Sequence, residues 1–405
     1  MRASLMRLPY RRLLDGGRAY AAFTEADLRL LDEFLSGEEI LDPTSGYGVM
    51  TRRAVQLGFD TYCVEMNPPQ YLWQYLTKPD TRALFKELAA RSSSAVDSVS
   101  VAMPRALVST EWLPRESKDL LIELFDAIHE VCRTAGADNE IPSEIAAIAL
   151  LLPFGGRLSA CVAGDITHVK RGGICVYEGW KEDYKTYCDA LVTHIERVED
   201  GMPSTRHELV LGDARVEPLP LGRFRAMLTS PPYPNRSDYG DMFRPERAIL
   251  DFLTIENRIP PMDSARSRLI GTNTVKGEGV RVPRGDAANR FLDAGDEQEM
   301  TDRAKYDWNV YYRPYFMNYF CDIEDLYANV ATSLAAEFKG YVIVANNTRR
   351  KLTVPVDAVI AETWESLGFH VSTYETREAF HVGTKNPRAR GHKARHATYA
   401  LEIVR

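Results

Sequence analysis

The sequence predicts an α/β fold in which a doubly wound, mostly parallel sheet is interrupted by a mainly helical insertion. Three observations predict this class. Short apolar strands at 40–42 and 60–65 flank a glycine turn and a helical stretch. Residues 71–205 contain amphipathic segments with helical periodicity. From residue 207 onward, apolar strands alternate with helices again, as they do when helices connect parallel strands.

A first helix is predicted to begin after Thr24. The side chain of Thr24 can cap it together with Asp27, three residues later, and Gly37 ends it. Leucines three and four residues apart supply its apolar face: Leu28, Leu31 and Leu35. This helix precedes the first strand.

The next unit has the pattern of half a nucleotide-binding sheet. The strand at 40–42 runs into a turn with Gly46 and Gly48, a helix follows, and the strand at 60–65 ends in an acid. Glycines let the backbone approach a ligand closely, and an acid after the second strand can hold both hydroxyls of a ribose. The spacing is not GxGxxG, and a lone GxG turn is more often a plain loop.

The insertion is predicted to contain four helices, with serines 92–94 breaking the first of them. They lie near 79–90, 117–136, 142–152 and 180–201. In the last helix, large apolar residues recur every three or four positions. We interpret this stripe as core, not as a base-stacking surface; it comprises Trp180, Tyr184, Tyr187, Leu191, Ile195 and Val198.

The rest of the sheet is predicted from residue 207 onward. The sequence predicts strands near 208–211, 224–229, 340–345, 369–375 and 397–404, and helices near 321–337 and 355–366. Residues 255–304 are rich in Gly, Pro, Asp and Arg and show little periodicity. They are predicted to form an extended loop that clamps substrate or is partly disordered without it.

Composition indicates a soluble globular protein. The chain has 405 residues, 45% hydrophobic and 26% charged, enough for one large domain and an inserted one. It has no long apolar run that predicts a membrane span, and its Arg-rich first twelve residues lack the apolar core of a secretory signal. Its six cysteines form no C-x-x-C pair, which favours buried thiols of a cytoplasmic protein over disulfides or zinc ligands.

The tetrapeptide Ser230-Pro231-Pro232-Tyr233 follows the predicted strand 224–229. Its two prolines lack N–H donors and have fixed φ angles, so this segment presents carbonyls and a hydroxyl beside an aromatic ring. Such a segment can accept hydrogen bonds from an –NH2 group while the ring stacks on the planar base that carries it. Taken alone, the same tetrapeptide is more often an inert strand-to-loop turn.

The two motifs together resemble a known family. Residues 42–48 (DPTSGYG) are similar to the S-adenosylmethionine loop, DPxxGxG, of amino-methyltransferases acting on DNA. Glu65-x-Asn67-Pro68 is similar to their ribose-binding acid, and SPPY matches their catalytic (S/D/N)PP(Y/F/W) signature. The resemblance covers two blocks, roughly residues 20–70 and 206–405. It implies a Rossmann-like class I methyltransferase fold with a seven-stranded mixed sheet and S-adenosylmethionine as cofactor.

The resemblance also implies a set of cofactor contacts. Asp213 lies in a segment similar to the one whose acid reaches the adenine of the cofactor, and Phe23-Thr24 lies where the family often places contacts ahead of the glycine loop. The implied cofactor-binding residues are Phe23, Thr24, Asp42, Pro43, Thr44, Ser45, Gly46, Gly48, Glu65, Asn67 and Asp213.

The family pattern divides the chain into three parts. Residues 1–70 and 206–405 form the catalytic domain, and 71–205 form the helical insertion. An insertion after the second strand departs from the family's usual arrangement. We therefore assign target recognition to the insertion, to the 255–304 loop, or to both.

Within the family, SPPY occurs mainly on enzymes that make N4-methylcytosine, and DPPY or NPPY on those that make N6-methyladenine. The predicted product is N4-methylcytosine in DNA, with N6-methyladenine as the alternative. An exocyclic amine is a poor nucleophile because its lone pair is delocalised into the ring. We expect Ser230 and Pro231 to accept its two N–H bonds and expose the lone pair, while Tyr233 stacks on the flipped base. Pro232 completes the rigid loop, so much of the catalysis would be positioning.

Charge is segregated along the chain. A net charge of −7 argues mildly against a nucleic-acid partner, but one basic run contains no acid. We expect it to contact phosphate from a hairpin between the last two strands; it comprises Lys385, Arg388, Arg390, Lys393 and Arg395. The shorter basic clusters at 349–351 and 170–171 are interpreted as solvated loops. The histidines among the last residues have no metal-binding spacing, and no metal is expected.

Polar residues follow the SPPY loop directly. Asn235, Arg236 and Tyr239 are predicted to line the base pocket or hold the target strand. For Asn235 and the neighbouring Asp238, loop capping is an equal alternative.

The favoured partner is double-stranded DNA, without membrane association. A place as the modification enzyme of a restriction or phage-defence system, with a partner from that system, follows from family analogy alone. Three alternatives remain open: an RNA methyltransferase acting on guanine N2, a methyltransferase acting on protein glutamine, and a non-catalytic nucleic-acid-binding module with a relict cofactor pocket. Intact Asp42, Glu65 and Ser230 argue against the last.

Overall fold

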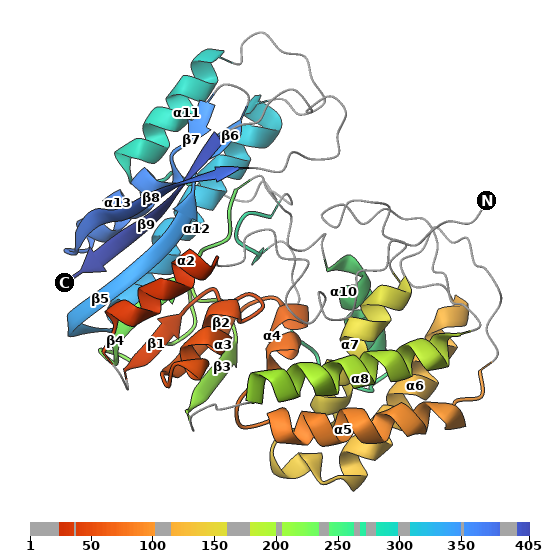
Figure 1. Cartoon of the computed structure of the whole chain (residues 1–405). Coiled ribbons are helices and arrows are strands. Elements are labelled where there is room, and N and C mark those ends of the chain that lie inside the picture. Colours follow the sequence, from red (N-terminus) through yellow and green to blue (C-terminus); the bar gives the residue numbers. More distant parts are fainter. Residues whose placement is uncertain are drawn as a thin grey trace.

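A seven-stranded mixed sheet lies at the centre of the larger part of the protein (Figure 1). The computed structural model describes residues 24–35, 38–101, 115–159, 179–199, 205–234, 243–262, 268–272, 281–298, 308–349, 352–380 and 395–405. The sheet strands are β1 (Glu39–Asp42), β2 (Asp60–Glu65), β3 (His207–Leu211), β4 (Phe224–Thr229), β5 (Leu334–Ala345), β8 (His370–Phe380) and β9 (Arg395–Val404). The predicted α/β class with seven strands is confirmed.

The strand order is β3-β2-β1-β4-β5-β9-β8. The first five strands in this order pair in parallel, and β9 pairs antiparallel with both β5 and β8. The chain winds from β1 through β2 to β3 on one side, and β4 then pairs with the other side of β1. The winding direction therefore reverses between β1 and β4. In open α/β sheets, ligands bind outside the carboxyl ends of the strands at such a switch point.

Helices cover both faces of the sheet (Figure 1). One face carries α2 (Glu25–Leu28), its 3₁₀ continuation (Arg29–Glu33) and α3 (Val49–Gln56). The other carries α11 (Asp286–Gln298), α12 (Arg313–Thr332) and α13 (Val356–Ser366), with a π-helical turn (Trp308–Tyr312) and a hairpin of β6 (Asn347–Arg349) and β7 (Leu352–Val354) alongside. Within β4, Ala226 and Leu228 enter the first core and Met227 the second. Burial on both faces explains why this strand is a nearly continuous apolar run.

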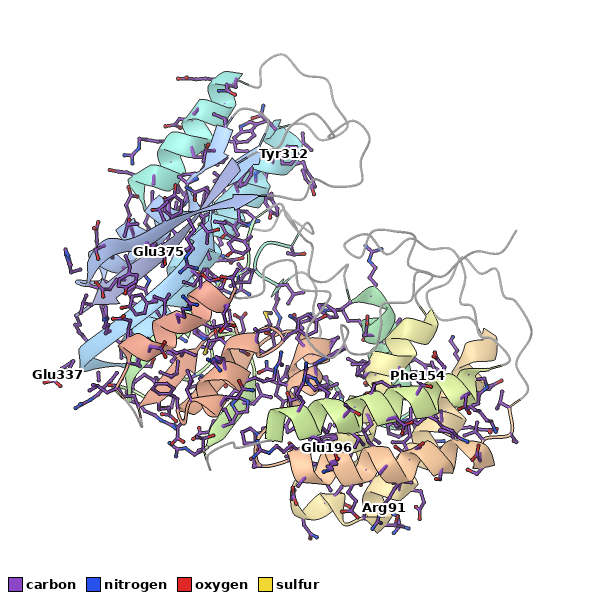
Figure 2. The ribbon with its side chains drawn as sticks, in the orientation of Figure 1. Arg91, Phe154, Glu196, Tyr312, Glu337 and Glu375 are labelled. Carbon is purple, nitrogen blue, oxygen red and sulfur yellow. The ribbon has the colours of Figure 1, made fainter. Side chains whose placement is uncertain are left out.

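A separate helical body lies beside the sheet, next to β3 (Figure 1). Among the described residues, five of its helices lie between β2 and β3 in the chain: α4 (Pro68–Tyr75), α5 (Arg82–Ala95), α6 (Arg115–Thr134), α7 (Ser143–Ser159) and α8 (Trp180–Glu199), with 3₁₀ turns at Val96–Ser98 and Ala137–Asn139. Tyr184 and Tyr187 of the α8 stripe are fully buried, as expected of core residues. Phe154 of α7 packs edge-on against Tyr184, with ring centroids 5.0 Å apart (Figure 2).

A sixth helix of this body, α10 (Arg244–Ile255), comes from beyond the predicted boundary at residue 205. It follows the SPPY segment and packs on α7. The fit is close, because a Cβ added at Gly155 would lie 2.8 Å from Cδ1 of Ile249. We refer to α4–α8 together with α10 as the helical body.

The structure corrects the extended loop predicted for 255–304, because α11 occupies part of it. Phe291 of this helix packs edge-on against Phe316 of α12, with ring centroids 4.9 Å apart. Its first turn is capped from another element, since Glu362 of α13 accepts the N–H of Ala287 at 2.7 Å. The partners that stabilise α11 are therefore distant in sequence, and local periodicity did not reveal them.

Several predicted helix ends are also wrong. α5 continues through Ser92, whose buried hydroxyl donates to the carbonyl of Ala89 at 3.2 Å and lies 3.3 Å from the Tyr184 hydroxyl. α7 runs past Pro153, beyond its predicted end at residue 152. α12 starts earlier than predicted and gives way to β5 at residue 334, inside the predicted helix 321–337. The first helix ends before Leu35, which is 72% exposed and outside its apolar face.

Four cysteines lie within the described residues, and all four are buried free thiols: Cys63, Cys132, Cys188 and Cys321. None of the helices in these residues has the length and hydrophobicity to cross a membrane.

Candidate active site at the ends of β1 and β4

The glycine turn and the SPPY loop are in direct contact. The glycine turn follows β1 and the SPPY loop follows β4, and these strands are neighbours in the sheet. The Thr44 hydroxyl lies 2.9 Å from that of Thr229 and 3.4 Å from the carbonyl oxygen of Ser230. The Thr229 hydroxyl donates to Oδ1 of Asp42 at 2.8 Å. The two motifs, about 190 residues apart in the chain, therefore meet at one point of the switch-point edge.

The glycine turn is held in shape by Glu65. Gly46 and Gly48 have left-handed φ angles of 56° and 66°, which a side chain would disfavour. The Gly46 N–H donates to Oε2 of Glu65 at 2.6 Å, and the Asn67 N–H donates to Oε1 at 2.7 Å. An ionised carboxylate has about four acceptor positions, so Glu65 retains capacity for a further donor.

Two buried carboxyls face this turn. Burial raises the pKa of Asp42 from 3.8 to about 7, against hydrogen bonds from Thr229 and Thr44 that lower it. Burial likewise raises the pKa of Glu65 from 4.5 to about 8, against the backbone hydrogen bonds of Asn67 and Gly46. Oδ2 of Asp42 and Oδ1 of Asn67 are buried without a hydrogen-bond partner among the described residues. The site therefore has unused acceptor capacity and favours a bound donor or cation.

The SPPY loop is closed upon itself. The Ser230 hydroxyl lies 3.0 Å from the hydroxyl of Tyr233, which also donates to the carbonyl of Ile343 at 3.4 Å. The Tyr319 hydroxyl of α12 donates to the Pro232 carbonyl at 3.0 Å. Tyr233 is only 5% exposed and packs in the core beneath the loop. In this conformation the ring expected to stack on a base is covered, and Ser230 is bonded to it.

Asp213, the acid expected to reach the adenine, is engaged by an arginine. Arg215 contacts both its oxygens, with Nε 2.9 Å from Oδ1 and the NH2 group 2.6 Å from Oδ2. Arg215 also pairs with Asp322 of α12 at 2.6 Å and donates to the carbonyl of Arg268. Any cofactor contact of Asp213 would therefore involve its ion pair with Arg215, which was not predicted from the sequence.

Thr24 caps α2, as predicted. Its hydroxyl accepts from the N–H of Asp27, and its own N–H donates to Asp27 Oδ2 at 2.7 Å. In the part of the chain that the structure describes, no hydrogen bond joins Thr24 to the glycine turn. Arg395 is the first residue of β9 and pairs with Phe380 at the end of β8. The other predicted contacts lie outside the described residues: Phe23, Asn235, Arg236, Tyr239, Lys385, Arg388, Arg390 and Lys393.

Four residues at the site were missed from sequence. Thr229 and Arg215 each lie beside a predicted motif residue, so a neighbouring polar side chain was the available signal. Gln74 donates to the glycine turn from α4, and Tyr319 holds the SPPY loop from α12. Only the fold shows that these two reach the site.

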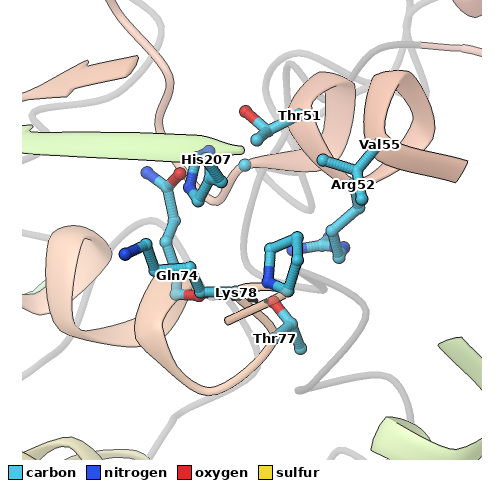
Figure 3. A pocket seen from close by; sticks show the side chains of 9 residues that line it. Thr51, Arg52, Val55, Gln74, Thr77, Lys78 and His207 are labelled. Carbon is cyan, nitrogen blue, oxygen red and sulfur yellow. Dashed lines mark hydrogen bonds between the residues drawn. The ribbon is translucent and has the colours of Figure 1, made fainter. Parts of the chain in front are cut away.

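A shallow pocket lies behind the glycine turn, between α3 and α4 (Figure 3). Its polar side chains are bonded to the protein itself: Arg52 donates to the carbonyl of Tyr47 at 2.6 Å, and Lys78 pairs with Asp80 at 2.6 Å. His207 at its wall lies 2.6 Å from the Thr61 hydroxyl, and burial lowers its pKa to about 3, which keeps it neutral. These contacts support the turn from behind.

The chain matches no protein-family model, no curated protein and no solved structure. Among the described residues, no cluster of three or more His, Cys, Asp or Glu side chains has the geometry of a metal site.

Proposed function

We propose that this protein is an S-adenosylmethionine-dependent methyltransferase that methylates the exocyclic amine of a flipped base in DNA, with cytosine N4 as the favoured position. The observation that carries the proposal is the contact between the glycine turn and the SPPY loop through Thr44, Thr229 and Ser230. A methyl donor bound at one loop and an amine bound at the other would be neighbours. If the glycine turn and the SPPY loop lay at opposite ends of the sheet, this proposal would be excluded.

The described residues fit the cofactor. S-adenosylmethionine carries a positively charged sulfonium, an ammonium group and two ribose hydroxyls. Ionised Glu65 has acceptor capacity left for a ribose hydroxyl, and buried Asp42 has one oxygen without a partner among the described residues for a cationic donor. Gly46 and Gly48 give the turn its left-handed backbone angles, and the Gly46 N–H is held against Glu65. The bound cofactor would supply an electrophilic methyl carbon.

The strand order supports a Rossmann-like class I assignment. The parallel order β3-β2-β1-β4-β5 is that of the doubly wound nucleotide-binding sheet, and both motifs lie at its switch point. The antiparallel β9 then completes a mixed sheet of seven strands.

On the acceptor side, the Ser230 hydroxyl and the Pro231 carbonyl would accept the two N–H bonds of the amine. That removes the lone pair from conjugation and directs it toward the methyl group. For this, Ser230 must exchange its contact with the Tyr233 hydroxyl for one with the base. The SPPY loop is therefore expected to shift when a base enters, and Tyr319 anchors its far side at Pro232.

Transfer of a labelled methyl group tests the proposal directly. The protein is incubated with tritiated S-adenosylmethionine and, separately, with DNA, tRNA and a protein mixture. We expect label in DNA, and nucleoside analysis of that DNA should yield N4-methylcytosine. Label in N6-methyladenine, in tRNA or in protein would select one of the alternatives. No cofactor binding by calorimetry at micromolar concentration would favour a relict pocket and overturn the proposal.

Stability of the cofactor-free protein should fall as the pH rises from about 5 to 8, and this fall should level off above pH 8. Asp42 and Glu65 have folded-state pKa values of about 7 and 8, above their ordinary values of 3.8 and 4.5. In that window the folded state holds protons that the unfolded state has lost, so raising the pH favours unfolding. Thermal denaturation across this range should show the melting temperature decreasing with pH.

Two comparisons check the cause of this dependence. Asp42→Asn removes one of the titrating groups and should reduce the slope. Saturating S-adenosylmethionine should also reduce it, because bound positive charge favours the ionised carboxylates. A slope unchanged in Asp42→Asn would show that other groups are responsible.

A further inference from the structure

The first helix of the helical body lies directly against the glycine turn. α4 begins three residues after Glu65, and its inner face presents Gln70 and Gln74, which are 6% and 3% exposed. The Gln74 Nε2 donates to Oγ of Ser45 at 2.8 Å and to the carbonyl of Gly46 at 2.9 Å. One amide group therefore bonds two successive residues of the turn.

Both backbone polar groups of Gly46 are held, from opposite sides. Its N–H is bonded to Glu65 in the sheet, and its carbonyl is bonded to Gln74 in the helical body. Gln74 also fills the space beside Gly48, where a Cβ would lie 2.7 Å from Oε1 of Gln74. The glycine at 48 is thus required by its left-handed φ and by this side chain.

A second contact joins the turn to the same body. Tyr47, between the two glycines, is 4% exposed and belongs to the core of the helical body. Its ring packs edge-on against Trp73 of α4, with centroids 5.4 Å apart, and at a tilt against Phe243, just before α10, with centroids 5.6 Å apart. Residues 45–48 are therefore shaped as much by the helical body as by the sheet.

We propose that Gln74 is a positioning residue for the cofactor turn, so that the helical body forms one wall of the cofactor site. The inference rests on the proposed function, since it assigns Gln74 to the same site. Glu65 alone would hold the Gly46 N–H while also serving the ribose hydroxyls. Gln74 fixes the next carbonyl independently, so the turn is already ordered when the cofactor arrives. Ordering before binding increases affinity, because the entropic cost of ordering is not incurred on binding.

The test is Gln74→Met, which keeps an unbranched side chain of similar length and removes both donated hydrogen bonds. We expect S-adenosylmethionine to bind about tenfold more weakly by calorimetry, and its KM to rise by a similar factor. The kcat at saturating cofactor and the KM for DNA should stay near wild-type values. Gln56→Met, the same change at an exposed position at the end of α3, is the matched control and should bind normally.

Gln74→Glu separates donor chemistry from packing. It preserves size, and its ionised form offers only acceptors to the Ser45 hydroxyl oxygen and the Gly46 carbonyl. Assayed at a pH above the raised pKa of a buried carboxyl, it should bind the cofactor at least as weakly as Gln74→Met. Wild-type affinity in Gln74→Glu would overturn the positioning role. A melting temperature lowered in Gln74→Met, with cofactor affinity unchanged, would also overturn it, because that result describes a purely structural residue.

Failure of this inference differs from failure of the proposed function. If the wild-type protein does not bind S-adenosylmethionine, the proposed function fails and the inference fails with it. If wild type binds and Gln74→Met binds equally well, only the inference fails. Ser45→Ala, which removes one of the two acceptors of Gln74, should give a smaller loss of affinity and supports the inference should Gln74→Met not fold.

Discussion

Replacing Glu65 by glutamine should weaken S-adenosylmethionine binding about a hundredfold, which corresponds to roughly 2.7 kcal/mol. The two oxygens of Glu65 accept the N–H groups of Gly46 and Asn67, and glutamine must offer one of them an –NH2 group instead. The charge available to ribose hydroxyls is lost as well. Hydrogen bonds to charged groups contribute about 1.5–3 kcal/mol each, so the loss of one of them accounts for the expected decrease in binding free energy. Calorimetry with the purified variant measures it.

Glu87→Gln is the matched control for this change. Glu87 lies on the surface of α5, where it pairs with Arg91, and the same substitution there should leave cofactor affinity unaltered. The melting temperature of Glu65→Gln should change little near neutral pH, because the raised pKa of Glu65 keeps it largely uncharged there and glutamine has the same size. Wild-type affinity in Glu65→Gln would remove Glu65 from the cofactor site.

Tyr233→Ala should slow methyl transfer by about a hundredfold or more, because base stacking contributes about 1–3 kcal/mol and the ring also supports the loop. The structure adds a second effect. Tyr233 is buried, so its truncation leaves a cavity and should destabilise the protein by about 3–5 kcal/mol. Single-turnover transfer, cofactor affinity and melting temperature therefore need to be measured together. Cofactor affinity that falls as much as the rate would contradict the assigned role.

Tyr233→Phe separates the two effects. It keeps the ring and the packing but removes the hydroxyl that bonds Ser230 and Ile343. We expect near-wild-type stability and a rate of methyl transfer within about tenfold of wild type, because only one neutral hydrogen bond is lost. Tyr327→Phe, in the same core, is the control: its hydroxyl is buried without a hydrogen-bond partner among the described residues. That change should leave transfer unaffected.

The features predicted from sequence are those that local chemistry determines. The strands near 224–229 and 340–345 are apolar runs because both faces are buried, and such runs are visible in any sequence. Gly46 and Gly48 mark left-handed backbone, which few other residues adopt. The contact between the two motif loops follows from the adjacency of β1 and β4, which the predicted doubly wound topology implied.

The features that were missed depend on contacts between distant segments. Ser92 remains helical because Tyr184 and the helical body bury it, against the preference of serine for helix ends. α11 is capped by Glu362, more than seventy residues away. The burial of Tyr233 likewise results from packing against α12 and has no local sequence signal. Arg215 is close to Asp213 in the sequence, but its second partner, Asp322 of α12, is distant.

The packing of Ile249 of α10 against Gly155 of α7 has a consequence for how the chain folds during synthesis. Helices α4–α8 of this body precede β3 in the chain, yet the surface that receives Ile249 stays uncovered until residues beyond β4 have been synthesised. The helical body is therefore not formed by one continuous segment of the chain. The helical body is complete only after β4, the diproline that follows it and α10 have been synthesised. The sheet and the helical body are therefore expected to fold together rather than as independent units.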